Sequence, residues 1–338
     1  MILAGDIGGT KCTLALYAHS GEELRQICYF KVPTRSSKTV AEILEQFNSH
    51  AQRQGIDLHN GIMCAGFGVA GTLVGDRVQS ANLPWPVERS AIAAALKLDA
   101  SKVTLLNDLV AAASSLAHLK SSDLLQLNEG SREALAPMAF IAAGTGLGEA
   151  ILFWDGQRYK VSPSEAGLTD FAPRNDREFL LLQSMRHRMP RVCTEDVISG
   201  RGFRVIHQVI FPGVQHAFFD DPDVDVAAKI TQQALSGSCG ACVETLQIWI
   251  ETYGAEAGNM ALRVLPFGGV YIAGGIALKV VPKLKDGSFV RAFSDKIQLS
   301  NQLAKIPIYL VLNEDAPVLG AAHDALAHAE ATASNPTG

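Results

Sequence analysis

The sequence has no surplus of positive charge. Its 338 residues include 29 Lys and Arg against 34 Asp and Glu, which gives a formal net charge of −5. Without a general basic field, we do not expect the chain to bind nucleic acid through its phosphates. A specific anionic ligand would instead need local backbone donors.

Signals for export and for membrane insertion are also missing. Residues 1–9 are apolar, but they carry no basic flank and already include Asp6, so we do not expect a secretory signal. No apolar run approaches the ~20 residues that a membrane-spanning helix needs. We therefore expect no membrane partner.

Cysteine is scarce, and the six thiols are dispersed at Cys12, Cys28, Cys64, Cys193, Cys239 and Cys242. In a large chain without an export signal we expect reduced thiols and a cytoplasmic location. Cys239 and Cys242 have the spacing of metal or redox pairs. Zinc takes about four ligands, however, and no second Cys/His pair lies nearby in the sequence. We therefore expect both to be buried structural thiols.

No stretch rich in proline and glycine divides the chain. Hydrophobic residues make up 48% and charged residues 19% of the 338 positions. A chain of this length holds more material than one core usually serves, so we expect two domains. Residues 331–338 lack large apolar side chains and should form a disordered tail.

Two segments share one design, an apolar run followed by a glycine turn and a second apolar run. Residues 2–17 and 140–154 are each expected to form a β-hairpin, which suggests a duplicated architecture. Apolar patterning predicts further strands at 103–106, 270–273 and 306–312, and helices at 39–54, 90–98, 109–119, 224–235, 242–265 and 320–329. Ser90 is the expected N-cap of the second helix. Strands that alternate with helices indicate an α/β class.

The first hairpin turn contains Asp-Ile-Gly-Gly-Thr at 6–10. Glycines without Cβ let backbone N–H groups approach an anion, so Gly8 and Gly9 can form a nest for phosphate oxygens, to which Thr10 adds a hydroxyl. Asp6 is the kind of hard oxygen ligand that Mg²⁺ prefers. A plain tight turn would use the same glycines.

The second hairpin repeats the pattern with Gly-Thr-Gly-Leu-Gly at 144–148. Its spacing is neither that of a P-loop nor that of a dinucleotide-binding fingerprint, because no helix follows the glycines. Gly274 and Gly275 end another expected strand, where a flat adenosine could approach closely. Three glycine turns at the ends of expected strands are stronger evidence for binding of phosphates and adenosine than any one of them alone.

Three places carry acidic side chains suited to sugar chemistry. Asp108 follows Asn107 directly after a buried strand, and an aspartate there could take the proton of a hydroxyl that attacks phosphorus. The alternative is an N-cap for the following helix. Glu165 and Glu195 could accept hydrogen bonds from vicinal sugar hydroxyls, although single glutamates are more often surface or capping acids.

Taken in order, these motifs resemble those of the bacterial glucokinase family, within the sugar kinase/Hsp70/actin superfamily. The resemblance covers about residues 1–328. It rests on residues 6–10, 107–108 and 144–148, and also on Asp-Phe-Ala-Pro at 170–173, Ser-Gly-Arg-Gly at 199–202 and Gly-Gly-Val-Tyr-Ile-Ala-Gly-Gly-Ile at 268–276.

The resemblance implies a ribonuclease H-like α/β fold of two lobes, as in actin-like ATPases and hexokinases, with a cleft between them. The small domain would comprise 1–108, completed by a helix at 315–330, and the large domain would comprise 109–314. It also implies ATP-dependent phosphorylation of glucose to glucose 6-phosphate, with Mg²⁺ as cofactor and a homodimer as the assembly.

Family roles transfer to matching positions. Asp108 would be the general base on the sugar 6-hydroxyl, and the sugar contacts would be Asn82, Asn107, Asp108, Glu165 and Glu195. The phosphates would be held by Gly8, Gly9, Thr10, Gly144, Thr145 and Gly146, the hydrated Mg²⁺ by Asp6, and the adenosine by Gly274 and Gly275.

One departure from the family pattern affects sugar binding most directly, and Ala166 in place of a family glycine is a smaller change. Leu168 stands where the family has a histidine that hydrogen-bonds the sugar. Leucine offers no such partner, so a sugar hydroxyl buried against it would lose ~1–3 kcal/mol. Two rival hypotheses follow: a kinase of another hexose, or a catalytically weak sugar-binding or regulatory protein.

Overall fold

The structure is a computed structural model, which describes residues 1–334 except 22, 59–60 and 81. It divides into a first unit, residues 1–119 with 315–338, and a second unit, residues 120–314. A helix with the length and apolar character needed to cross a membrane is not found within the described residues.

The first unit is built on a five-stranded sheet in the order β3-β2-β1-β4-β8. β1 is antiparallel to β2, which is antiparallel to β3, whereas β1, β4 and β8 run parallel. The strands are β1 (Ile2–Ile7), β2 (Lys11–Ser20), β3 (Glu23–Pro33), β4 (Cys64–Val69) and β8 (Val103–Asn107). A small second sheet contains β5 (Thr72–Val74), β6 (Arg77–Gln79) and β7 (Val87–Glu88).

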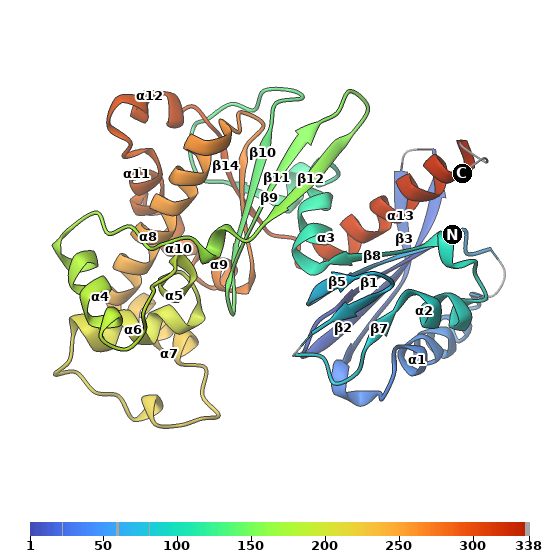
Figure 1. The fold of residues 1–338 in the computed structure, drawn as a ribbon, viewed down its shortest axis with the longest axis horizontal. Helices are drawn as coiled ribbons and strands as arrows, with labels where there is room; N and C mark the ends of the chain where they lie inside the picture. Colours follow the sequence, from blue (N-terminus) through green and yellow to red (C-terminus); the bar gives the residue numbers. More distant parts are fainter. Residues whose placement is uncertain (22, 59–60, 81, 335–338) are drawn as a thin grey trace. The chain divides into compact units, whose positions relative to one another are not determined.

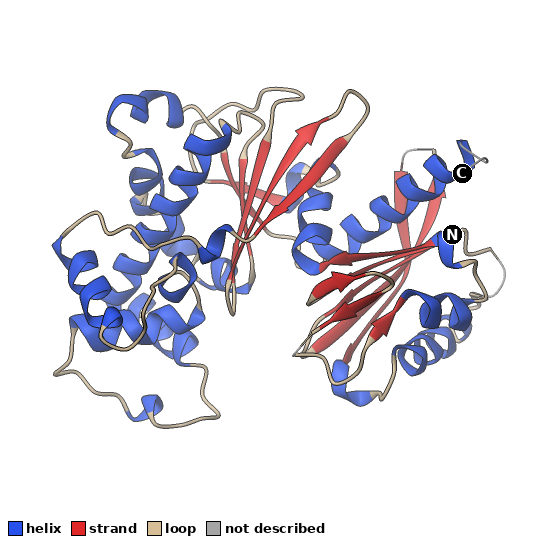
Figure 2. Cartoon of the chain, in the orientation of Figure 1, coloured by secondary structure: helices blue, strands red, loops and turns tan. Residues whose placement is uncertain are grey.

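Helices cover both faces of this sheet, α1 (Val40–Gln52) and α2 (Arg89–Leu96) on one face and α3 (Asp108–Ser114) and α13 (Ala316–Ser334) on the other (Figures 1 and 2). Successive strand residues point to opposite faces. Leu3 accordingly joins the core beneath α1 and α2, and Ala4 joins the core beneath α13. The helix pair α3–α13 is tightly packed, because a Cβ at Gly320 would lie 1.8 Å from the carbonyl oxygen of Ala111.

The second unit contains a six-stranded sheet in the order β12-β11-β10-β13-β14-β9. Its strands are β9 (Leu124–Gln126), β10 (Met138–Ala143), β11 (Leu147–Trp154), β12 (Tyr159–Ser164), β13 (Val270–Ala273) and β14 (Ile308–Val311). As in the first unit, three antiparallel strands (β10, β11 and β12) are followed by two that run parallel to the first of them. The duplicated architecture that the glycine hairpins suggested is therefore present in the strand order.

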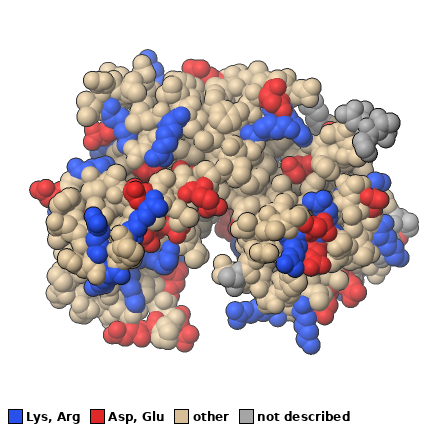
Figure 3. Space-filling model, viewed as in Figure 1, with Lys and Arg blue, Asp and Glu red and all other residues tan. Residues whose placement is uncertain are grey.

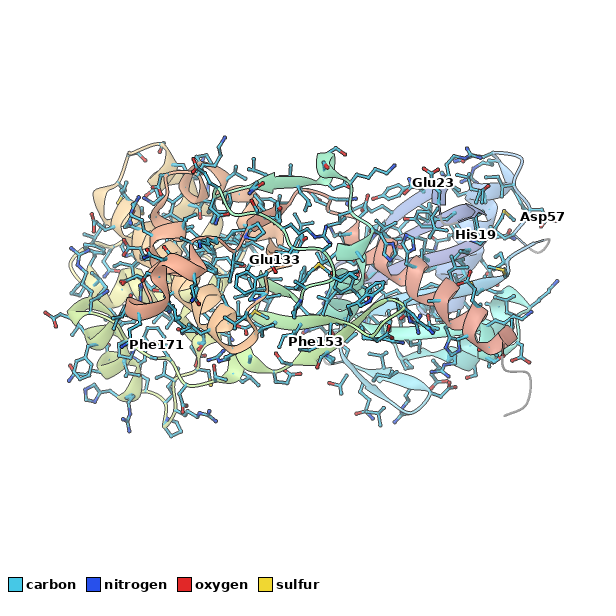
Figure 4. All side chains as sticks on the ribbon, turned by 90° about the horizontal axis from the view of Figure 1, so that it is seen from above. His19, Glu23, Asp57, Glu133, Phe153 and Phe171 are labelled. Atoms are coloured by element: carbon cyan, nitrogen blue, oxygen red, sulfur yellow. The ribbon has the colours of Figure 1, made fainter. Side chains whose placement is uncertain are left out.

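The helices of the second unit are α4 (Asp176–Arg186), α5 (Thr194–Val197), α6 (Gly200–Ile210), α7 (Val226–Leu235), α8 (Gly240–Val264), α9 (Gly275–Lys279), α10 (Val281–Leu284), α11 (Ser288–Ser294) and α12 (Ser300–Leu303). α8 is central: Trp249 is fully buried and stacks on Phe203 of α6 with ring centroids 4.7 Å apart. Phe171, labelled in Figure 4, belongs to the same core.

Short 3₁₀ turns connect the longer elements. They are η1 (Thr34–Ser36), η2 (Ala100–Lys102), η3 (Ser115–Ala117), η4 (Ser121–Asp123), η5 (Ala166–Leu168), η6 (Ala217–Phe219) and η7 (Ile297–Leu299). On the face shown in Figure 3, basic and acidic side chains are interspersed within each unit. This distribution agrees with the small net charge of the chain.

Three expectations about boundaries need correction. The first unit ends after Leu119 and not after residue 108, because α3 packs on α13 and β4. α13 continues to Ser334, past the expected end at 330, and residues 335–338 of the expected tail lie outside the described residues. Ser90 is not an N-cap, since α2 already begins at Arg89, whose N–H is held by the carbonyl oxygen of Asp76.

Candidate functional site

The carboxyl ends of three parallel strands meet at one edge of the first sheet. Ile7 of β1 pairs with Val69 of β4, and Val69 pairs with Asn107 of β8. The turn after β1, the turn after β4 and the start of α3 therefore lie side by side. Ligands of open α/β sheets commonly bind at this edge. Seven of the predicted residues belong to it: Asp6, Gly8, Gly9, Thr10, Asn82, Asn107 and Asp108.

The glycine turn after β1 is held by backbone hydrogen bonds. Gly8 N–H donates to the carbonyl oxygen of Lys11 over 3.0 Å, and Thr34 Oγ1 donates to the carbonyl oxygen of Gly8 over 2.5 Å. A Cβ at Gly9 would lie 2.9 Å from the carbonyl oxygen of Asn82. Glycine is therefore needed here for close packing as well as for any approach by phosphate, and it places Asn82 beside the turn.

Asn107 and Asp108 connect β8 to α3. Asn107 is the N-cap, and its Oδ1 accepts from Leu109 N–H over 2.9 Å. Its Nδ2 donates to the carbonyl oxygen of Gly71 over 2.9 Å, which joins it to the turn after β4. Asp108 is partly buried, and Oδ1 of its carboxylate accepts from Leu109 N–H over 2.9 Å. Burial raises the pKa of Asp108, while these backbone bonds oppose the rise.

Asp6 adds a second carboxylate to this strand edge. Its partner on β4 is Gly68, where a Cβ would lie 3.6 Å from Asp108 Cα. Burial, and next the charge of Asp108, raise the pKa of Asp6 to about 6. Two carboxylates that repel each other at the surface of a buried strand form a site where a hard divalent cation would be stabilising. The residues present therefore fit a Mg²⁺ ion.

The second unit has its own glycine turn between β10 and β11. Gly144 N–H donates to the carbonyl oxygen of Gly146 over 2.8 Å, and Gly200 N–H donates to the carbonyl oxygen of Gly144 over 2.9 Å. Helix α6 thus begins against this turn, and its N-terminus adds a positive dipole end there. Gly274 is adjacent in space, since a Cβ there would lie 2.6 Å from the carbonyl oxygen of Ala143.

A cavity of about 350 Å³ opens beside this turn. Its lining consists of Gly144, Thr145, Gly200, Arg201, Asp225, Ala227, Ala228, Thr231, Ile276 and Lys279. The volume lies within the range of small-molecule sites. Small apolar side chains from α7 and α9 line it, and an ion pair of 3.6 Å between Lys279 and Asp225 borders it.

Glu195 lies directly on the second glycine turn. Its Oε2 accepts from Leu147 N–H over 3.3 Å, and a Cβ at Gly146 would lie 2.7 Å from the same oxygen. Its Oε1 is 3.3 Å from the guanidinium of Arg201. The carboxylate is therefore oriented from two sides.

Backbone contacts place the segment that contains Glu165 near the second glycine turn. It precedes η5, where a Cβ at Gly167 would lie 2.1 Å from the carbonyl oxygen of Leu147. Thr194 N–H donates to the carbonyl oxygen of Thr169 over 2.8 Å, which joins the segment after η5 to α5, the helix that carries Glu195. Glu165 and Leu168 are exposed, Leu168 by 47%.

Sequence reasoning overlooked several residues of the second unit. Arg201, Asp225 and Lys279 line the cavity, but none was assigned a role. The Ser-Gly-Arg-Gly motif at 199–202 was a signal that could have identified Arg201, because it stands at the start of a helix. Asp225 caps α7 through Ala228 N–H at 3.0 Å, which agrees with the helix expected at 224–235.

The expectation that Cys239 and Cys242 have no further metal ligands nearby is wrong. His207 and His216 lie beside them, and the four ligand atoms are within 4.8 Å of one another. The histidines precede the cysteines by more than twenty positions, so only the packing of α6 against α8 brings them together.

Comparisons with known proteins give one consistent result. The family model described as Glucokinase matches residues 3–328. A glucokinase from Nostoc sp. is 37% identical over 341 residues, which cover 95% of this chain and 98% of that protein.

Solved structures agree in fold. The crystal structure of glucokinase from an Antarctic psychrotroph matches with a TM-score of 0.83 and 27% identity, covering 96% of this chain and 98% of that one. A ROK family glucokinase from Streptomyces griseus, in complex with glucose and AMPPNP, matches with a TM-score of 0.62 and 21% identity, covering 96% and 99%. These matches confirm the expected two-lobed α/β class of the actin-like ATPases.

Proposed function

The chain belongs to the glucokinase family, and we propose that it transfers the γ-phosphoryl group of ATP to the 6-hydroxyl of glucose, which gives glucose 6-phosphate. The observation that carries this proposal is the position of Asp108. Its carboxylate stands at the carboxyl end of β8, next to the glycine turn after β1, and is held by the start of α3. Burial raises its pKa, which favours a carboxylate that accepts a proton.

Asp108 takes the proton of the attacking hydroxyl. The rest of the site positions the two substrates and stabilises the negative charge of the phosphates. Phosphoryl transfer needs little covalent help from the protein beyond that proton. The turns at residues 8–10 and 144–146 donate to phosphate oxygens through Gly9, Thr10, Thr145 and Gly146, because the N–H groups of Gly8 and Gly144 are bonded within their own turns. The N-terminus of α6 adds positive potential beside the second turn.

Adenosine is assigned to the cavity of the second unit. Ala227, Ala228 and Ile276 supply apolar surface for the base, and Gly275, where a Cβ would meet nothing within 4 Å, leaves open space next to Ile276. A glucokinase of the same fold binds an ATP analogue together with glucose. ATP is therefore the phosphoryl donor that we propose.

Asp6 is the residue that would hold Mg²⁺, directly or through water. The bound ion would neutralise charge on the phosphates. Asp6 itself contributes a partly buried carboxylate whose pKa of about 6 leaves it ionised at neutral pH. Lys11 opposes the rise of that pKa and so favours the ionised form.

Sugar recognition is assigned to Asn82, Asn107, Glu165 and Glu195, together with Asp108. The two glutamates accept hydrogen bonds from vicinal hydroxyls, and charged acceptors form the stronger bonds. Glu195 is held in place for this role by Leu147 N–H and by Arg201. Asn107 is fixed by its bonds to Gly71 and to the start of α3.

We also propose that the protein works in the cytoplasm as a homodimer. The assembly rests on the family resemblance alone. The location rests on six cysteines that are all unpaired, since such thiols persist in a reducing compartment.

A coupled assay with Mg-ATP across glucose, mannose, fructose, glucosamine and N-acetylglucosamine tests this function. We expect glucose to give the highest kcat/KM, with glucose 6-phosphate as the product. A higher kcat/KM for another hexose would overturn glucose as the substrate. Sugar binding without turnover of any sugar would overturn the kinase.

A further inference from the structure

Four side chains that the proposed kinase mechanism does not use gather in one place in the second unit. His207 lies in α6, and His216 lies in the segment after it, directly before η6. Cys239 is the N-cap of α8, and Cys242 lies in the first turn of that helix. Together they offer two imidazoles and two thiols from three separate elements.

The four ligand atoms are spaced for a metal ion. All lie within 4.8 Å of one another, and Nε2 of His216 is 3.7 Å from Cys239 Sγ and 3.6 Å from Cys242 Sγ. In a tetrahedral zinc site with Zn–S of about 2.3 Å and Zn–N of about 2.0–2.1 Å, sulfur and nitrogen ligands are ~3.5–3.6 Å apart. The observed sulfur–nitrogen distances are close to these values. A thiol–imidazole hydrogen bond has a similar length, so His207 must discriminate between the two.

His207 supplies an independent observation. Its side chain is fully buried, and neither ring nitrogen has a hydrogen-bond partner in the described part of the chain. Phe219 packs against the ring, with centroids 5.1 Å apart, and the ring of His216 lies 5.0 Å away. A buried polar group without a partner is costly, and a metal ion at the thiols would give one of these nitrogens a partner.

We propose that His207, His216, Cys239 and Cys242 bind a structural zinc ion. Thiolate and imidazole ligands in a tetrahedral arrangement select zinc over Mg²⁺ and Ca²⁺, which prefer oxygen. Four protein ligands fill a tetrahedral shell and leave no open position for a substrate. A closed shell of this kind is typical of a structural site and not of a catalytic one.

The site has a clear structural consequence. His216 lies in the long connection from Phe211 to Asp225, between α6 and α7, which contains only the single turn η6. A metal bond from His216 to α8 would fix this connection to the core of the second unit. α7, which follows it, supplies Ala227, Ala228 and Thr231 to the cavity assigned to adenosine.

Two other states of the same cysteines compete with zinc. A Cys-x-x-Cys pair at a helix N-terminus can form a disulfide, and two free thiols can simply be buried. Cys242 Sγ does donate to Gln233 Oε1 over 3.4 Å, so the thiol has a partner without a metal. Neither alternative gives His207 a partner, whereas zinc does.

Metal analysis of the full-length chain tests the site. The protein is purified without chelator, incubated with zinc sulfate, dialysed, and analysed by mass spectrometry for zinc and by X-ray absorption at the zinc edge. The same is done for Cys242→Ser and His216→Ala. Cys193→Ser and His187→Ala are the controls, because each removes the same residue type from the same unit outside the cluster.

We expect about one zinc ion per chain, with two sulfur and two nitrogen ligands, in the wild type and both controls. The two cluster variants should lose the bound zinc. A wild-type chain without stoichiometric zinc would overturn the proposal, as would a disulfide between Cys239 and Cys242 in the intact mass of the unreduced chain.

A second measurement avoids any dependence on the folding of the variants. Co²⁺ is titrated into the metal-free wild-type chain, and the absorption spectrum is recorded. A tetrahedral site with thiolate ligands should give intense visible bands and a near-ultraviolet charge-transfer band. A spectrum of octahedral Co²⁺ alone would contradict the proposed ligand set.

Discussion

The side-chain amide of Asn107 donates a hydrogen bond of 2.9 Å to the carbonyl oxygen of Gly71, while its Oδ1 caps α3. One side chain therefore connects the end of β8, the start of α3 and the turn after β4. The adjacent Asp108 takes its orientation from the same helix start. The position of the proposed base is thus set by residues that also stabilise the fold.

Replacing Asn107 by alanine should lower both stability and activity. It removes a helix cap, worth about 1 kcal/mol, and the bond to Gly71, worth a similar amount. We expect the free energy of unfolding in urea to fall by ~1–3 kcal/mol and kcat to fall by about tenfold or more, because Asp108 loses its support.

Asn175→Ala is the matched control for Asn107→Ala. Asn175 caps α4 through Glu178 N–H at 3.0 Å and has no proposed role in the reaction. This variant should lose stability but keep its kcat. An Asn107→Ala enzyme with unchanged kcat would contradict the positioning role.

A methyl group at Gly146 should disturb sugar binding through Glu195. The new Cβ would lie 2.7 Å from Glu195 Oε2, so the carboxylate must shift away from its position against Leu147 N–H. We expect Gly146→Ala to raise the KM for glucose by ~10-fold or more, the cost of one displaced charged hydrogen bond.

Gly213→Ala is the control for this prediction, since a Cβ there meets nothing within 4 Å and its φ is not in the left-handed region. It should leave KM unchanged. Equal KM values for glucose in the two variants would contradict the expected displacement of Glu195.

Leu168 allows a gain of function to be tested. It stands where the family has a sugar-binding histidine, and its side chain is 47% exposed. Leu168→His would restore a hydrogen-bond partner worth ~1–3 kcal/mol, so kcat/KM for glucose should rise by roughly 5- to 150-fold. Leu180→His in α4, at a leucine that is 49% exposed, should have no effect. Steady-state assays with glucose measure both, and a fall in kcat/KM for Leu168→His would refute the prediction.

Glu149 should make stability depend on pH. Both of its carboxylate oxygens are buried without a hydrogen-bond partner in the described part of the chain. Burial, and next the charge of Glu256, raise its pKa from 4.5 to about 8. Between these values the folded chain keeps a proton that the unfolded chain has lost, so the contribution of Glu149 to stability is fully present below pH 4.5 and is lost as the pH rises to about 8.

Glu149→Gln removes this titration. The difference in free energy of unfolding between Glu149→Gln and the wild type should grow in favour of the variant between pH 4.5 and about pH 8, by an amount on the order of a few kcal/mol. Urea unfolding at several pH values measures it. Glu133→Gln, at an exposed glutamate, is the control and should show no such growth. If the free energies of unfolding of Glu149→Gln and the wild type changed in parallel with pH, the raised pKa of Glu149 would be contradicted.

Much of the fold could be predicted from local patterns. The hairpins at 2–17 and 140–154 followed from apolar runs interrupted by glycine, and the structure has β1–β2 and β10–β11 there. The strand at 270–273 was also predicted correctly, because short branched runs signal buried strands. Local patterning did not predict β3, β4 or the small sheet β5-β6-β7, because β3 and β5 are partly or fully exposed, β4 is rich in glycine, and β6 and β7 are only two or three residues long.

The parts of the site that escaped prediction depend on tertiary contacts. The bond from Leu147 to Glu195 joins residues that lie far apart in the sequence. The approach of His207 to Cys242 likewise requires α6 to pack on α8. Spacing motifs cannot detect such pairs, because nothing in the intervening chain has a fixed length requirement.

The most direct test of the proposed mechanism is kcat for glucose phosphorylation by wild type and Asp108→Asn, with the product identified as glucose 6-phosphate. Asparagine keeps the size of the side chain but cannot accept the hydroxyl proton. We predict that the wild type forms glucose 6-phosphate and that the variant loses ~10²–10⁴-fold in kcat while it still binds glucose. A variant that keeps the wild-type kcat would contradict the assignment of Asp108 as the general base.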